Sequence, residues 1–252
     1  MRREIKLLVC WLAMAAAGWA QAPAAPAAID AATAKQIATM ETKLNDWPQL
    51  GRYLVDNATL GTPAPGEKRV VFYGDSITDG WGRRAGTGTF FPGKPYVNRG
   101  ISGQTTAQMV VRFRQDVVDL HPAAVLILAG TNDVAGNTGP MTAGMTEDNF
   151  RSMTDMAKAN GIKVILASIT PAADYPWRTG LQPAGKIKAL NVWLQQYCKD
   201  NKLTYLDYYS PLTDADGGMK EGTSFDGVHP NEKGYGIMAP LAQAAIDKTV
   251  GK

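Results

Sequence analysis

Short apolar runs alternate with amphipathic segments through most of the chain after Lys68. Five of these runs have the length of buried strands, and most are rich in valine, isoleucine or aromatic residues. They cover residues 69–73, 96–98, 123–129, 163–169 and 204–208. The pattern therefore predicts five strands, of which the strand at 96–98 has the weakest signal.

The segments between these runs have helical spacing. Apolar residues fall on one face in three of them: Val110, Phe113, Val117 and Leu120; Ile187, Leu190, Leu194 and Tyr197; Ile237, Leu241 and Ala245. Buried strands that alternate with amphipathic helices predict a parallel sheet covered on both faces. The expected fold is α/β, a three-layer α/β/α domain of flavodoxin-like type with a five-stranded parallel sheet. Right-handed crossovers would place all strand carboxyl ends at one edge, where such folds bind ligands.

The first twenty residues have the pattern of a secretory signal peptide. A positively charged start is followed by an apolar stretch at residues 7–17 and a Gly-Trp-Ala cleavage site at 18–20. The alternative is an uncleaved membrane anchor, but the apolar stretch is shorter than a bilayer span requires. We therefore expect a secreted or periplasmic protein with no stable membrane insertion after cleavage of residues 1–20.

Residues 21–67 are expected to form a linker and a helical extension. Alanine and proline dominate residues 21–29, a composition typical of extended linkers. Apolar residues with helical spacing follow and predict a helix over residues 30–46. The main domain is then expected to span residues 68–252.

Composition and charge exclude several classes of protein. Of the 252 residues, 45% are hydrophobic, which is enough for one sizeable core. The net charge of +3 is spread without long basic runs, so no nucleic-acid partner is expected. Two histidines argue against a catalytic zinc site, and neither a metal nor another cofactor is expected. Cys10 would leave with the signal peptide, so Cys198 would have no disulfide partner within the chain.

Four short polar patches follow predicted strands or lie in a late loop. They are Gly74-Asp75-Ser76, Ile101-Ser102-Gly103, Gly130-Thr131-Asn132-Asp133 and Asp226-Gly227-Val228-His229-Pro230. Together they contain a hydroxyl, amide donors, a carboxylate and an imidazole, which are the groups that an acyl-transfer hydrolase needs. Each patch alone also fits an ordinary turn or loop, so the prediction depends on their combination.

The candidate nucleophile is Ser76, which follows the first strand of the main domain by two residues. His229 is the candidate base, because imidazole is well suited to take the serine proton near neutral pH. Asp226 can accept a hydrogen bond from one ring nitrogen and leave the other for the serine. The second histidine, His121, precedes a strand and belongs to the opposite edge of the sheet, so we interpret it as structural.

Three groups could stabilise a developing oxyanion: the backbone amides of Ser76 and Gly103 and the side-chain amide of Asn132. Trp81 and Trp177 are candidate substrate-binding residues, although the glycine-rich loop that contains Trp81 could equally be a packed surface loop. The expected partner is a small-molecule or glycan ester. The oligomeric state is left open.

The patches and their order resemble the SGNH hydrolases, also called GDSL esterases and lipases, over about residues 68–246. The four residues of the family name match Ser76, Gly103, Asn132 and His229. Asp226 matches the third member of the family's triad, and Ile77 stands where the family name has leucine, a change between two apolar residues. The resemblance implies a cofactor-free ester hydrolase that forms an acyl-serine intermediate.

The resemblance leaves the substrate open, because the family contains esterases, acetylhydrolases, lysophospholipases and thioesterases. A secreted location favours short acyl or acetyl esters, including those on glycans, over acyl-CoA thioesters. A non-catalytic module that binds acylated glycans is a different class, and the complete set of candidate residues argues against it. A flavin or nucleotide binder would need a phosphate loop where Asp75 and Asp79 stand, and these carboxylates would repel phosphate.

Overall fold

The computed structural model describes residues 29–251 of the chain. The predicted signal peptide and nearly all of the alanine- and proline-rich linker lie outside these residues. The chain divides after Met40 into two units, of which the second, Glu41–Lys252, contains the whole sheet. Helix α1 (Ala31–Asn45) runs across this division and agrees with the helix predicted over residues 30–46.

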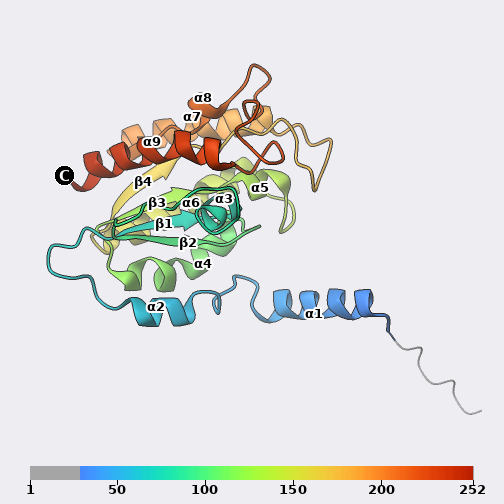
Figure 1. Ribbon diagram of the computed structural model, residues 1–252, viewed down its shortest axis with the longest axis horizontal. Coiled ribbons are helices and arrows are strands. Elements are labelled where there is room, and N and C mark those ends of the chain that lie inside the picture. Colours follow the sequence, from blue (N-terminus) through green and yellow to red (C-terminus); the bar gives the residue numbers. More distant parts are fainter. Residues whose placement is uncertain (1–28, 252) are drawn as a thin grey trace, which may run out of the picture. The chain divides into compact units, whose positions relative to one another are not determined.

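All five predicted strands are present and form one parallel sheet, so the predicted three-layer fold is confirmed (Figure 1). They are β1 (Val70–Gly74), β2 (Tyr96–Gly100), β3 (Ala124–Leu128), β4 (Lys163–Ala167) and β5 (Thr204–Leu206), in the order β2-β1-β3-β4-β5. At the end of β1, Gly74 pairs with Gly100 of β2 and Leu128 of β3. The order of strands reverses direction at β1, which is where sheets of this type bind ligands.

Helices cover both faces of the sheet, and each face has its own hydrophobic cluster. One face packs against α4 (Thr106–Asp116), the 3-10 helix η1 (Val118–Leu120), α6 (Ala143–Ala159) and α7 (Ala184–Asp200). The other packs against α3 (Ser76–Gly80), α8 (Tyr209–Leu212) and α9 (Glu232–Val250). Figure 1 shows α4 and α9 on opposite sides of the strands. Because side chains alternate along a strand, Val71 and Tyr73 enter the first cluster, while Val70 and Phe72 enter the second.

The segment at residues 41–67 belongs to the same compact unit as the sheet. It contains α2 (Leu54–Leu60), a helix with no buried residue and therefore little periodic signal in the sequence. Backbone carbonyls at Trp47, Pro48 and Leu50 accept hydrogen bonds from the side chains of Gln108, Gln104 and Gln115, at 2.6, 2.7 and 2.7 Å. The buried Tyr53 hydroxyl donates to the carbonyl oxygen of Gly100. This segment therefore holds α4 and the end of β2.

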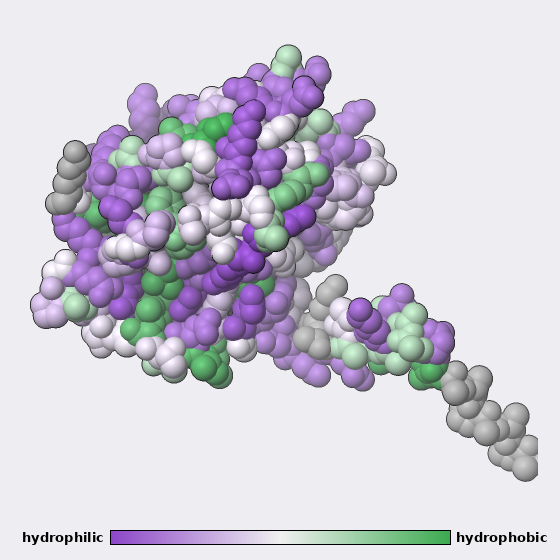
Figure 2. Space-filling view, viewed as in Figure 1, coloured by the Kyte–Doolittle hydropathy of each residue, from purple (hydrophilic) through white to green (hydrophobic). Residues whose placement is uncertain are grey.

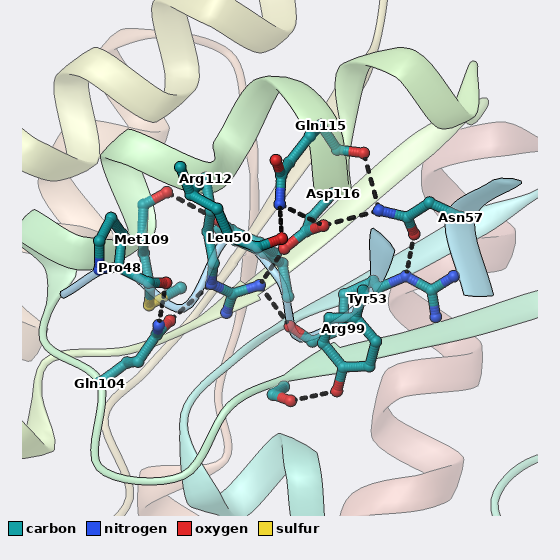
Figure 3. Close-up of polar contacts among 12 residues, drawn as sticks. Pro48, Leu50, Tyr53, Asn57, Arg99, Gln104, Met109, Arg112, Gln115 and Asp116 are labelled. Atoms are coloured by element: carbon teal, nitrogen blue, oxygen red, sulfur yellow. Dashed lines mark hydrogen bonds and ion pairs between the residues drawn. The ribbon is translucent and has the colours of Figure 1, made fainter. Parts of the chain in front are cut away.

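A buried ion pair lies beneath the ends of β1 and β2 (Figure 3). Arg112 and Asp116 of α4 are 3.0 Å apart, and neither side chain is exposed to solvent. The Arg112 guanidinium also donates to the carbonyl oxygens of Gly74, at 3.1 Å, and Arg99, at 2.9 Å. Asn57 of α2 donates to the Asp116 carboxylate at 2.7 Å. Since these bonds fix the last residues of two adjacent strands, they also fix the loops that follow.

Hydrophilic residues cover most of the Glu41–Lys252 unit on the face shown in Figure 2. Hydrophobic residues interrupt them in small groups rather than in one broad patch. Leu54 and Val55 of α2 and Val111 of α4 are among the exposed apolar side chains. Within residues 29–251, no helix has the length and apolar character needed to cross a bilayer.

Candidate active site

The four polar patches meet at one cavity of about 550 Å³. Ser76 begins α3 after β1, and Gly103 lies in the loop after β2. Asn132 lies in α5 (Thr131–Ala135) after β3, and His229 lies in the loop before α9. All four residues line the cavity. The parallel topology brings them together, because the carboxyl ends of β1, β2 and β3 are level with one another.

Ser76, His229 and Asp226 form a continuous chain of hydrogen bonds. Ser76 Oγ lies 2.9 Å from His229 Nε2, and His229 Nδ1 lies 2.8 Å from Asp226 Oδ2. The backbone amides of His229 and Val228 donate to Asp226 Oδ1 at 2.8 and 3.1 Å. Partial burial alone would raise the pKa of Asp226, but the hydrogen bonds from the His229 amide and ring outweigh it and hold this pKa below its ordinary value. An ionised carboxylate is thus positioned to orient the imidazole.

Two glycines allow α3 to pack closely against the sheet and present Ser76. A Cβ atom on Gly74 would lie 2.2 Å from Thr78 Oγ1, and one on Gly100 would lie 2.1 Å from the Asp79 amide nitrogen. Neither glycine has a positive φ. Space for α3, rather than an unusual backbone conformation, therefore requires glycine at both positions.

Two buried carboxyl groups lie next to the cavity residues. Asp75 caps α3 by accepting a hydrogen bond from the Ile77 amide at 3.0 Å, and burial raises its pKa to about 7. Asp133 accepts hydrogen bonds from the Thr106 amide at 3.0 Å and from Thr146 Oγ1 at 3.3 Å. Burial also raises the pKa of Asp133. Asp133 of α5 therefore connects the starts of α4 and α6, whereas Asp75 caps α3.

Replacing Asp75 with asparagine should make stability less dependent on pH. Between its ordinary pKa of 3.8 and the folded-state pKa of about 7, folded wild type keeps a proton that the unfolded chain has released. This group's contribution to the free energy of unfolding therefore falls as pH rises through that window. The Tm difference, Asp75→Asn minus wild type, should therefore be larger at about pH 8 than at about pH 5. The increase should be roughly 2–4 °C for each kcal/mol by which the difference in the free energy of unfolding changes.

Thermal melts at the two pH values would measure this difference. The matched control is Asp148→Asn, since the Asp148 side chain is 75% exposed. Its Tm difference from wild type should show no such trend. A Tm difference for the Asp75 variant that is the same at both pH values would contradict the prediction.

The side-chain amide of Asn132 is held in one orientation. Its Nδ2 donates to the carbonyl oxygen of Gln104 at 3.0 Å, and its Oδ1 accepts from Asn137 Nδ2 at 2.6 Å. Gly103 has a φ of +80° and lines the cavity near this amide group. The Ser76 amide lies in the first turn of α3, where helices lack internal acceptors. Asn132, Gly103 and Ser76 thus each bring a possible hydrogen-bond donor to the lining of the same cavity.

Asn137 is a cavity residue that the sequence did not reveal. Besides its bond to Asn132, its Oδ1 accepts a hydrogen bond from the indole nitrogen of Trp177 at 3.2 Å. It therefore connects the amide of Asn132 to the ring of Trp177, which lies in the loop between β4 and α7. In the sequence, Asn137 follows a glycine, and this pattern does not indicate which residues its side chain contacts. In the structure, that glycine, Gly136, has left-handed backbone geometry and ends α5.

The two tryptophans that were predicted to contact substrate occupy different environments. Trp177 lines the cavity, and its ring lies 5.7 Å from the His229 ring. Trp81 is only 3% exposed and packs in the core, 5.9 Å from Phe72 and 4.8 Å from Tyr235 between ring centroids. Trp81 is therefore not among the residues that line the cavity, and its ring packs α3 and α9 against the sheet.

The remaining histidine and cysteine lie away from the cavity. His121 lies between η1 and β3, at the end of β3 opposite to Asn132. Cys198 is buried in α7, and burial raises the pKa of its thiol to about 12. Among the residues that the structure describes, no group of three or more His, Cys, Asp or Glu side chains could hold a metal ion.

Comparison with known proteins identifies the family. A model of the GDSL-like lipase/acylhydrolase family matches residues 72–237, more than half of the chain and all four polar patches. The chain belongs to this family. The resemblance to SGNH hydrolases that the sequence motifs indicated is thereby confirmed.

Solved structures of similar proteins cover most of this SGNH hydrolase. A candidate acylhydrolase from Bacteroides fragilis is 45% identical, with a TM-score of 0.77 over 81% of this chain and 98% of the other. A GDSL-like lipase from Bacteroides thetaiotaomicron is 46% identical, with a TM-score of 0.76 over 80% of this chain and 98% of the other.

Curated relatives match over shorter stretches. An acetylxylan esterase from Geobacillus stearothermophilus is 38% identical in a 90-residue alignment that covers 27% of this chain and 41% of that enzyme. The chain spans about half the length of the curated relatives that it matches.

Proposed function

We propose that this SGNH hydrolase is a secreted or periplasmic enzyme that cleaves carboxylic esters, with Ser76 as the nucleophile. The observation that carries this proposal is the unbroken chain from Ser76 Oγ through the imidazole of His229 to the carboxylate of Asp226, with contacts of 2.9 and 2.8 Å. A serine hydroxyl is a weak nucleophile unless a base lies within hydrogen-bond distance, and this arrangement provides one.

The first half-reaction transfers the acyl group to the enzyme. Ser76 Oγ attacks the ester carbonyl carbon while its proton passes to His229 Nε2, and the carbonyl oxygen becomes an oxyanion. The amides of Ser76, Gly103 and Asn132 would donate to this oxygen, and each such donor is worth about 3–4 kcal/mol in the transition state. The imidazolium then gives its proton to the leaving alkoxide as the carbon–oxygen bond breaks, and an acyl-serine remains.

The second half-reaction returns the enzyme to its starting state. A water molecule gives a proton to His229 and attacks the acyl-serine carbonyl, and the same donors stabilise the second oxyanion. Ser76 leaves with the proton held by His229, and the carboxylic acid is released. Asp226 keeps Nδ1 protonated throughout, so that Nε2 faces Ser76 in both halves.

The proposed substrates are short acyl or acetyl esters, including those on glycans. The likeness to an acetylxylan esterase and the predicted secretory signal support this class. Lysophospholipase or thioesterase activity is the alternative within the family. A module that binds acylated glycans without turnover is less consistent with a complete hydrogen-bond chain, since binding alone does not require it.

A substrate panel would test the proposal. The purified protein is assayed on 4-nitrophenyl esters of increasing chain length, acetylated xylo-oligosaccharides, a lysophospholipid and an acyl-CoA. We expect the highest kcat/KM for the shortest esters and release of acetate from the oligosaccharide. Preference for the acyl-CoA or the lysophospholipid would favour the alternative, whereas calorimetric binding of an acetylated glycan without any hydrolysis would reject the enzymatic function.

A further inference from the structure

Positive charges outnumber negative charges around the cavity that contains Ser76. Arg52, Arg83 and Arg84 line it, whereas Asp79 is the one carboxylate in its lining among residues 29–251. With a neutral imidazole, these side chains carry an excess of two positive charges. Asp226, the other carboxylate of the site, is hydrogen-bonded to the ring of His229, and counting its charge as well leaves an excess of one positive charge at the site.

Both carboxylate oxygens of Asp79 contact neighbouring side chains. It lies 2.9 Å from the Arg83 guanidinium and 3.7 Å from that of Arg52, and it accepts a hydrogen bond from Ser102 Oγ at 2.7 Å. Arg83 has a further partner in the hydroxyl of Tyr53, at 2.7 Å. Asp79 and its partners therefore connect α3 with the loop after β2. Arg84 is not among the residues that Asp79 contacts.

Arg84 is held at the cavity by an aromatic ring rather than by a carboxylate. Its guanidinium lies over the ring of Phe225, 4.1 Å from the centroid. Within residues 29–251, no ion pair joins Arg84 to an acidic side chain. A guanidinium that rests on a ring keeps its N–H donors available at its edges. Phe225 directly precedes Asp226, so the loop that carries the acid also positions Arg84.

We propose that the ester cleaved by this enzyme carries a negatively charged group, a carboxylate or a phosphate, and that Arg84 binds this group. The inference rests on the proposed ester hydrolysis at Ser76. Arginine is suited to the role because its N–H groups match the spacing of carboxylate and phosphate oxygens. The charge excess of the cavity lining would also attract an anionic substrate before contact.

The expected effect is moderate, because the Arg84 side chain is accessible to solvent. Ion pairs in such positions are weakened by water and by salt. Removing the charge should lower kcat/KM for an anionic ester relative to a neutral one by about two- to fivefold. The change should fall mainly on KM, because the charged group is present in the bound substrate as well as in the transition state.

Three matched pairs of esters test the inference and locate the charge. The first pair, mono-4-nitrophenyl glutarate and 4-nitrophenyl pentanoate, differs by a carboxylate on the acyl part. The second pair, 4-acetoxybenzoate and 4-acetoxybenzamide, differs by a carboxylate on the alcohol part. The third pair, 4-acetoxyphenyl phosphate and 4-methoxyphenyl acetate, tests a phosphate. For each pair, the ratio of kcat/KM for the charged ester to that for the neutral ester is measured in wild type, Arg84→Gln, Arg84→Glu and Arg114→Gln.

In at least one pair, wild type should prefer the charged ester, and Arg84→Gln should lower the ratio about two- to fivefold. Arg84→Glu should lower it further, and added salt should bring wild type toward the glutamine variant. The control Arg114→Gln should keep the wild-type ratio, since Arg114 is an exposed residue of α4 outside the cavity lining.

A wild type without preference in any pair, or an unchanged ratio in both Arg84 variants, would overturn the inference. Hydrolysis of the neutral esters would then still support the proposed function. If wild type hydrolyses none of the six esters, the proposed function itself fails.

Discussion

Replacing Ser76 with alanine is expected to reduce kcat/KM on 4-nitrophenyl acetate by several powers of ten and to leave Tm close to that of wild type. The change removes only Oγ, which faces His229 Nε2 at 2.9 Å. No bond to the acyl carbon can then form, whereas the surrounding packing stays the same. Steady-state kinetics and a thermal melt of the same preparation measure the two effects.

Ser102 provides a matched control for this experiment. It lines the same cavity, but its hydroxyl donates to Asp79 rather than facing the imidazole. A serine-directed phosphonate should therefore label wild type and Ser102→Ala, but not Ser76→Ala. Near-wild-type turnover by Ser76→Ala, or labelling of that variant, would show that another residue is the nucleophile.

Replacing Arg112 with leucine should cause the largest loss of stability among the substitutions considered. The Asp116 carboxylate would remain buried without its partner, and the carbonyl oxygens of Gly74 and Arg99 would lose a donor. Breaking one side of a buried ion pair typically costs about 3–5 kcal/mol. For a chain of this size, Tm should fall by roughly 10 °C or more. Thermal and urea unfolding measure the change.

Two further variants distinguish the effect of leaving the Asp116 charge buried and unpaired from the effect of losing an ion pair near the surface. In the double variant Arg112→Leu/Asp116→Leu, part of the loss should be recovered, since no isolated charge is left in the core. Arg151→Leu on α6 removes a partly exposed pair with the same spacing, Arg151–Glu147, together with a second pair to Asp148, and should cost only about 1 kcal/mol. If Arg112→Leu lowers Tm no more than Arg151→Leu does, the Arg112 network does not stabilise the fold.

The fold could be predicted because its signals are local. Buried strands such as β3 and β4 are continuous apolar runs, and the weak run at 96–98 still became β2 because it pairs with β1 along its whole length. The boundaries of the helices were predicted less exactly than the presence of the strands. The helical face that continued to Leu120 is divided between α4 and η1, since Val117 leaves helical geometry with φ −131° and ψ −63°.

The site was partly predictable, for reasons of topology. Ser76, Gly103 and Asn132 each follow a strand, so a parallel sheet must bring them to one edge. The direction of a side chain within a loop has no such signal. The ring of Trp81 therefore turned out to lie in the core, and the contacts of Asn137 came only from the structure.

The glutamine contacts before β1 set a practical limit on how this hydrolase can be shortened or fused. A chain cut at the start of β1 would leave the buried amides of Gln104 and Gln108 without their acceptors at Pro48 and Trp47. Each buried donor left without a partner costs about 1–3 kcal/mol, which is a sizeable part of a domain's total stability. A tag or a fused domain should therefore be joined upstream of Asp46, although the first sequence motif of the family begins only at Gly74, the last residue of β1.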